Sequence, residues 1–191
     1  MGEVSRRTSV ATTWGVTAAE QHRTYPCDAL LPSRSRRLLR GIDVAAPPEV
    51  VYRWLCQLRV APYSYDWIDN GGRRSPRTPL PWCWDLEVGQ QFARVFTLDS
   101  FTADRQLTLR MAPGVGTRLF GDVALSYVLT PVGPGRSRLV AALRLPAPTG
   151  RPSALRAWLL TWGDLVMMRR QLRTFARLAG ADAQMRAQPS V

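Results

Sequence analysis

The sequence holds few of the side chains that enzymes use as nucleophiles, general bases or metal ligands. Its one histidine, His22, lies near the N-terminus, so a Ser-His-Asp or Cys-His catalytic system is close to excluded. The three cysteines, Cys27, Cys56 and Cys83, form no CxxC pair, which predicts reduced thiols and no metal site. No glycine-rich phosphate loop follows a strand, and we expect no cofactor.

Catalysis or ligand orientation would therefore depend on carboxylates, tyrosines and arginines. The candidates are Asp66, Asp69, Arg94, Arg110, Tyr127 and Asp164. Arg94 is of special interest because strand alternation places it on the same face as Phe92 and Phe96. Inside an apolar cavity its guanidinium would hold a carboxylate, enolate or phenolate oxygen. A bulge or a shift of register would instead turn Arg94 outward, and the sequence leaves both alternatives open.

Composition indicates a folded domain, and its high net charge has two possible explanations. The chain has 191 residues, of which 46% are hydrophobic, and a formal net charge of +12. Such a charge is typical of proteins that bind nucleic acid or anionic membranes. However, all 26 basic residues are arginine, which is the bias that a GC-rich genome produces. We therefore discount the charge and expect no nucleic-acid partner.

The N-terminus and the hydropathy bear on where the protein is located. Ser5-Arg6-Arg7-Thr8 resembles a twin-arginine export signal only superficially, since residues 9–16 are too polar for an apolar export region. No run approaches the roughly 18 apolar residues of a membrane span. With an odd number of cysteines, these features predict a cytoplasmic protein without stable membrane insertion. Whether it is a monomer or a homodimer stays open.

The chain is expected to begin with an arm and continue into one domain. Residues 1–35 show no helical or strand period, and we interpret them as an arm that is partly ordered on the domain. Alternating apolar residues predict a strand over 37–44, near the start of a domain that spans 36–181. A flexible tail is expected over 182–191.

A helix and an aromatic loop should follow this strand. Pro48 and Glu49 suit the first turn of a helix, and Trp54 falls on its apolar face. In the loop 60–77, the aromatic residues either cap a core or line the mouth of a pocket; they are Tyr63, Tyr65 and Trp67. The sequence favours neither alternative.

Four further strands are predicted from alternating apolar residues, over 91–98, 107–111, 123–129 and 139–145. Short turns separate them, which is typical of an antiparallel meander with one polar face. The other face must be covered. A long C-terminal helix is the element with enough apolar surface to cover it.

That helix is predicted over Pro152 to Gly180, because proline suits a first turn and glycine a left-handed residue just past the end. Apolar residues occupy well over half of its circumference, and we expect Trp158, Trp162 and Met168 to face the sheet. Asp164 interrupts the apolar arc and needs a partner. The exposed arginines are interpreted as a solvated surface; they are Arg170, Arg173 and Arg177.

The order of these elements resembles the helix-grip fold of the START-like, or SRPBCC, superfamily. The resemblance covers Leu38 to Gly180, and its most specific pieces are the stretches 42–55 and 86–90. Residues 63–70 resemble a bacterial subgroup. The resemblance implies an α+β fold in which a curved antiparallel sheet wraps a long C-terminal helix, with an apolar cavity between them. The superfamily has no shared catalytic motif to transfer.

Three functions follow as hypotheses. The first is a protein that binds a small hydrophobic or aromatic ligand in this cavity, and the second is an enzyme of the polyketide cyclase or aromatase type. The third is a polyanion or membrane-surface binder. The expected pocket residues are Trp54, Tyr63, Tyr65, Asp66, Trp67, Arg94, Phe96, Tyr127, Trp158, Trp162, Asp164 and Met168.

Overall fold

A computed structural model describes residues 10–65, 72, 74–148 and 151–187. Its centre is a seven-stranded sheet in the order β1-β2-β7-β6-β5-β4-β3, antiparallel except for β1, which runs parallel to β2. The strands are β1 (Thr13–Trp14), β2 (Arg36–Val44), β3 (Gln91–Phe92), β4 (Phe96–Thr102), β5 (Gln106–Met111), β6 (Ala124–Gly133) and β7 (Arg136–Leu145). The antiparallel meander is confirmed.

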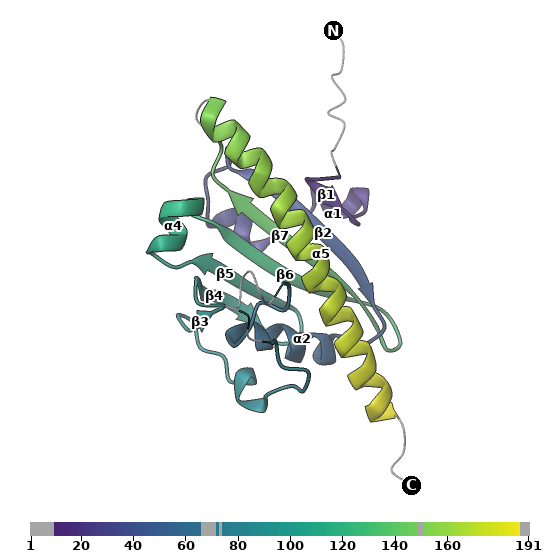
Figure 1. Cartoon of the computed structure of the whole chain (residues 1–191). Coiled ribbons are helices and arrows are strands. Elements are labelled where there is room, and N and C mark those ends of the chain that lie inside the picture. The colour runs from purple at the N-terminus through teal and green to yellow at the C-terminus, as the bar shows by residue number, and fades with distance from the viewer. Residues whose placement is uncertain (1–9, 66–71, 73, 149–150, 188–191) are drawn as a thin grey trace.

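One long helix lies across a face of this sheet, as Figure 1 shows. The helices are α1 (Ala18–His22), α2 (Pro48–Cys56), α4 (Val115–Phe120) and α5 (Arg151–Ala187), with short 3-10 helices at Pro26–Ala29, Gln57–Arg59 and Pro81–Trp84. The predicted helix-grip α+β fold, a curved sheet closed by a long C-terminal helix, is confirmed.

The main core lies between the sheet, α2 and α5. Its largest members include Trp54 from α2, Tyr127 from β6 and Phe175 from α5, all at most 2% exposed. Alternation in the strands and the 3-4 spacing in the helices bring these side chains to one layer. Burial of large apolar side chains here is the main source of folding free energy.

The opposite face of the sheet is covered as well, by the N-terminal arm. Tyr25 and Cys27 pack there on small residues of β6 and β7, including Ala124 and Ala142, in a second buried cluster. The expectation of one polar face was therefore wrong for the strands beside the arm. The signal lay in the middle of β6 and β7, where small or apolar residues (Ala124, Ser126, Val128, Val140 and Ala142) occupy the positions that arginines occupy near the ends of β7.

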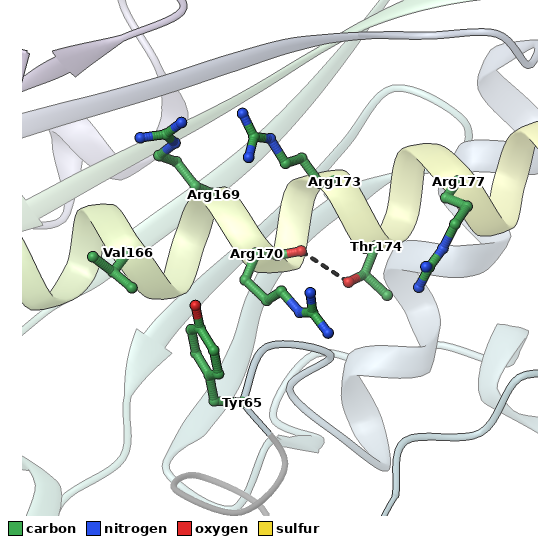
Figure 2. A pocket seen from close by; sticks show the side chains of 7 residues that line it. All are labelled: Tyr65, Val166, Arg169, Arg170, Arg173, Thr174 and Arg177. Atoms are coloured by element: carbon green, nitrogen blue, oxygen red, sulfur yellow. Dashed lines mark hydrogen bonds between the residues drawn. The ribbon is translucent and has the colours of Figure 1, made fainter.

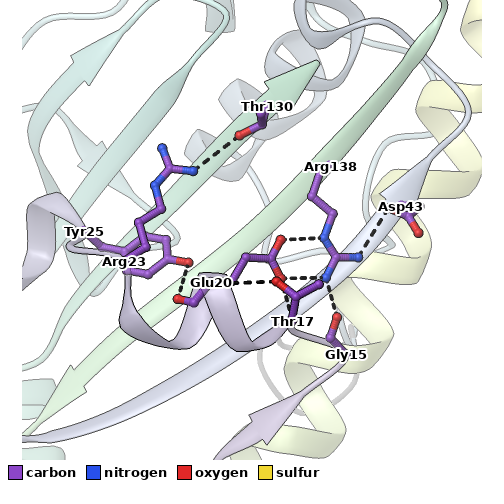
Figure 3. Close-up of polar contacts among 8 residues, drawn as sticks. All are labelled: Gly15, Thr17, Glu20, Arg23, Tyr25, Asp43, Thr130 and Arg138. Carbon is purple, nitrogen blue, oxygen red and sulfur yellow. Dashed lines mark hydrogen bonds and ion pairs between the residues drawn. The ribbon is translucent and has the colours of Figure 1, made fainter. Parts of the chain in front are cut away.

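Polar contacts fix the arm to the sheet (Figure 3). The Arg138 guanidinium donates from Nε and Nη2 to the two carboxylate oxygens of Glu20, at 2.8 and 2.9 Å. It also contacts Asp43 at 3.3 Å and the carbonyl of Gly15. Gly15 has a φ of 70° and leaves no room for a Cβ beside Gly41 of β2.

The helix α5 continues beyond its predicted end, so the helix stop at Gly180 was wrong. Gly180 is buried, and its missing Cβ would lie 3.6 Å from the carbonyl oxygen of Ala45. The helix then runs to Ala187, and Arg186 donates to Asp182 one turn earlier, at 2.8 Å. Residues 182–187 are therefore helical rather than part of a flexible tail.

Candidate functional site

Several of the expected pocket residues pack together in the space between the sheet and α5. Trp54 and Tyr63 meet edge to face, with ring centroids 6.2 Å apart, and Tyr63 lies 5.2 Å from the ring of Phe175. Met168 is buried in the same cluster. These side chains belong to the main buried core of the described residues.

Tyr127 ties the sheet to α5. Its hydroxyl donates to Oε1 of Gln171, and Nε2 of Gln171 donates in turn to the carbonyl of Pro62, at 2.6 Å. Burial raises the pKa of Tyr127 far above its usual value. The phenol is therefore neutral, and its one proton is used in a structural hydrogen bond.

Asp164 finds its partner in the strand β2. Nη2 of Arg40 donates to Oδ2 of Asp164 at 2.8 Å and to the carbonyl of Ala11 at 2.8 Å, while Nη1 donates to the carbonyl of Leu39. The Arg40 side chain is fully buried. Burial raises the pKa of Asp164 to about 6, although Arg40 opposes this shift. The pair joins β2, α5 and the arm.

Arg94 does not reach this space, and the expectation that it shares a strand face with Phe92 and Phe96 was wrong. The predicted strand 91–98 is broken by a tight turn between β3 and β4, in which Ala93 and Arg94 have φ values of 43° and 65°. The turn leaves Arg94 exposed and Phe96 half-buried. Arg110 is also at the surface, paired with Asp122 at 2.7 Å.

Trp158 and Trp162 also lie differently from the prediction. Both are exposed, and their rings pack on each other at 6.3 Å. Trp162 lies about 60–80° around the helix from the buried Leu165 and Leu172. Trp158 lies seven residues before Leu165, on the same side of the helix, but near the start of α5. The helix is apolar around more than half of its circumference, so hydrophobicity alone did not identify the buried side. Leu165 and Leu172 occupy the buried side, farther along the helix than either tryptophan.

Besides Tyr63, the aromatic loop contributes one further described candidate, Tyr65. Asp66, Asp69 and Trp67 lie outside the described residues. Tyr65 is half-buried and sits beside α5, with the guanidinium of Arg170 over its ring at 5.8 Å.

At this point the surface is hollowed, between α5 and Tyr65 (Figure 2). The hollow has a volume of about 490 Å³ and is open to solvent. We name it the arginine hollow; its lining residues are Tyr65, Val166, Arg169, Arg170, Arg173, Thr174 and Arg177. In Figure 2 the side chains of Arg169 and Arg173 extend to one side of the helix and those of Arg170 and Arg177 to the other.

The arginine hollow carries four cations and no lining carboxylate. Among the described residues, none of its arginines forms an ion pair. Arg169 and Arg173 instead lie over the ring of Trp14 from the arm, at 5.1 and 5.7 Å. Such stacking orients a guanidinium and leaves its N–H groups free to bind an anion.

Local structure explains why these side chains gather. The spacing of Arg169, Arg170, Arg173 and Arg177 places their backbone positions along little more than two turns of α5, within an arc of about 100°. From this arc the side chains diverge, Arg169 and Arg173 toward Trp14 and Arg170 toward Tyr65. The hydroxyl of Thr174 donates to the carbonyl of Arg170 at 2.8 Å, inside the helix. The helical spacing was visible in the sequence, but Tyr65 and Trp14 come from remote segments, and their place beside the arginines had no local signal.

A second, larger hollow lies near the arm and has mixed charge. It measures about 680 Å³, and its lining includes Arg23 and Arg105 together with Glu49 and Asp104. Opposite charges around one hollow favour neither an anion nor a cation, so the arginine hollow is the stronger candidate for a binding site.

Comparisons with known proteins give similarities of fold. No family model matches the chain, and no curated protein matches it. A solved protein from Mesorhizobium loti has a TM-score of 0.48 at 17% identity, covering 81% of this chain and 100% of its own. An aromatase/cyclase from a Streptomyces species has a TM-score of 0.42 at 14% identity, covering 81% and 97%.

A START superfamily protein from Mycobacterium smegmatis is similar too, with a TM-score of 0.41 at 15% identity, covering 79% of this chain and 99% of its own. All three are likenesses of fold alone, with TM-scores below 0.5. Within the residues that the structure describes, no helix is both long and apolar enough to cross a membrane.

Proposed function

We propose that the protein binds a small ligand in which an aromatic or apolar body carries an anionic group, and that the arginine hollow is the site. The observation that carries the proposal is the set of four arginines around one hollow, with no ion pair to any described residue. A guanidinium binds carboxylate, phosphate or sulfonate oxygens through paired N–H groups. The anion is therefore the part of the ligand that orients it.

The apolar part of the ligand has contacts of its own in the same hollow. Tyr65 and Val166 line it beside the arginines, and an aromatic ring can stack on the phenol or on a guanidinium plane. The volume lies within the range of small-molecule sites, about 300–1,000 Å³. The proposal keeps the expected class of ligand but moves the site from the sheet–helix interior to the outer side of α5.

The enzyme alternative finds less support. A cyclase or aromatase needs an acid or base that faces its substrate. Two of the candidates from the sequence are already engaged, the buried Tyr127 with Gln171 and the half-buried Asp164 with Arg40. The described side chains therefore favour binding over proton transfer.

A titration with 1-anilinonaphthalene-8-sulfonate tests the proposal, since this dye combines aromatic rings with one sulfonate. We expect saturable binding near one equivalent, weakened about tenfold by Arg170→Gln/Arg177→Gln, which corresponds to about 1.4 kcal/mol. The control is Arg94→Gln/Arg136→Gln, which removes the same charge from exposed positions elsewhere. Equal weakening in both variants would show a general charge effect and no specific site.

A further inference from the structure

A solvent-exposed stripe of apolar residues runs along the first half of α5. Leu155, Trp158, Leu159, Trp162 and Val166 are each between 41% and 62% exposed. Their spacing of three and four residues places them on one side of the helix. Figure 1 shows the first turns of α5 reaching past the end of β7. Surface apolar residues are usually scattered singly, and a continuous stripe marks an interaction surface.

The same side of the helix changes character after Val166. At about 100° per residue, Arg169, Arg170, Arg173 and Arg177 continue the stripe along the second half of α5. One face of a single helix thus presents tryptophan and leucine first and arginine next. A helix that rests on a membrane surface has this combination of apolar residues, tryptophan and basic residues.

A second copy of this chain is a weaker fit to the stripe. Stable protein–protein interfaces bury about 800 Å² per partner. Five side chains that are each between 41% and 62% exposed supply less than this. Antiparallel pairing along the whole of α5 would also place the arginines of one copy on the tryptophans of the other. The arginines favour a partner that carries negative charge.

We propose that this face of α5 docks on the surface of an anionic lipid bilayer. Trp158 and Trp162 would sit at the level of the headgroups, where the amphipathic indole ring is favoured, while Leu155 and Leu159 reach the acyl boundary. The arginines of the second half bind lipid phosphates. Docking on the surface goes beyond the proposed ligand binding and does not depend on it.

Vesicle co-sedimentation of the full chain tests this docking. The probes are vesicles of phosphatidylcholine alone and vesicles that also contain phosphatidylglycerol. We expect binding only to the anionic vesicles, with tryptophan emission shifted to shorter wavelength and with binding lost as salt is raised. Neutral and anionic vesicles binding equally, or neither binding, would overturn the proposal.

A variant of the stripe locates the contact. Trp158→Gln/Leu159→Gln should lower vesicle affinity at least tenfold, whereas the control Trp82→Gln/Val88→Gln, at two exposed apolar positions elsewhere, should keep it. Circular dichroism checks that both variants fold. Neither Trp158 nor Leu159 lines the arginine hollow, so the stripe variant should still bind 1-anilinonaphthalene-8-sulfonate. Its loss would count against the proposed ligand site, not against docking.

The oligomeric state of the protein without vesicles provides the last control. Light scattering should give a monomer for both wild type and the stripe variant. A wild-type dimer that the stripe variant converts to monomer would overturn the lipid assignment and identify a second copy of the chain as the occupant of the stripe.

Discussion

Arg40 and Asp164 join the sheet to the long helix through an ion pair 2.8 Å long, in which the arginine side chain is completely buried. The pair lies between β2 and α5, and Arg40 also holds the carbonyl of Ala11 in the arm. A buried charge that loses its partner is costly, whereas removal of both charges together is often nearly neutral. The pair therefore specifies how three segments meet more than it stabilises the fold.

Replacement of one partner should reveal this directly. Arg40→Leu leaves Asp164, whose side chain is only 16% exposed, without its cation and should lower the free energy of unfolding by about 3–5 kcal/mol. Arg40→Leu/Asp164→Leu should recover most of that loss. Urea denaturation of the three proteins gives the comparison. A double variant that is no more stable than Arg40→Leu alone would contradict this account of the pair.

The raised pKa of Asp164 predicts a pH dependence. Its folded-state pKa of about 6 exceeds the value of about 3.9 in an unfolded chain. Between these values the folded state holds the extra proton, so this group's contribution to stability falls as pH rises from about 4 to 6. The stability of wild type relative to Asp164→Asn should decline over that range. The stability of wild type relative to Glu87→Gln, which changes an exposed carboxylate, should show no such decline.

Two tryptophans, one buried and one exposed, test how α5 is oriented on the sheet. Trp54 is 2% exposed, so Trp54→Ala should cost about 3–5 kcal/mol of stability. Trp162 is 41% exposed, so Trp162→Ala should cost about 1 kcal/mol or less. Equal and large losses in the two variants would place Trp162 in the core and contradict the orientation of α5.

The arm should behave as part of the folded domain. Tyr25 is 1% exposed against the sheet, and Tyr25→Ala should lower the free energy of unfolding by about 3 kcal/mol. His22 is exposed three residues earlier, and His22→Ala should change it by no more than about 0.5 kcal/mol. Thermal denaturation measures both. An unaffected Tyr25→Ala protein would mean that the arm contributes nothing to stability.

Patterns of hydrophobicity were enough to predict the architecture. The start of α2 at Pro48 and the alternation in β2, β5, β6 and β7 each follow from local rules of proline placement and side-chain period. The pair of Arg40 and Asp164 could also have been found, since each is a charge that interrupts an otherwise apolar pattern. Buried charges of opposite sign on facing elements are expected to meet.

The remaining features depended on information that is not local. Ala93 and Arg94 have positive φ angles in the turn, but the turn lacks the glycine or asparagine from which such a conformation is usually predicted. The helix α5 has more apolar surface than one face of the sheet can cover, so which side is buried depended on packing. Trp14 and Tyr65 approach the arginines only through the folding of the arm and the loop.

The central claim is that the arginine hollow selects a ligand by its anionic group, and two related dyes test it most directly. N-phenyl-1-naphthylamine has the rings of 1-anilinonaphthalene-8-sulfonate but lacks the sulfonate. The ratio of their dissociation constants should favour the sulfonate by about tenfold or more in wild type. In Arg170→Gln/Arg177→Gln the ratio should approach one, with binding of the neutral dye nearly unchanged. A ratio near one in wild type, or a ratio that the variant leaves unaltered, would contradict the claim.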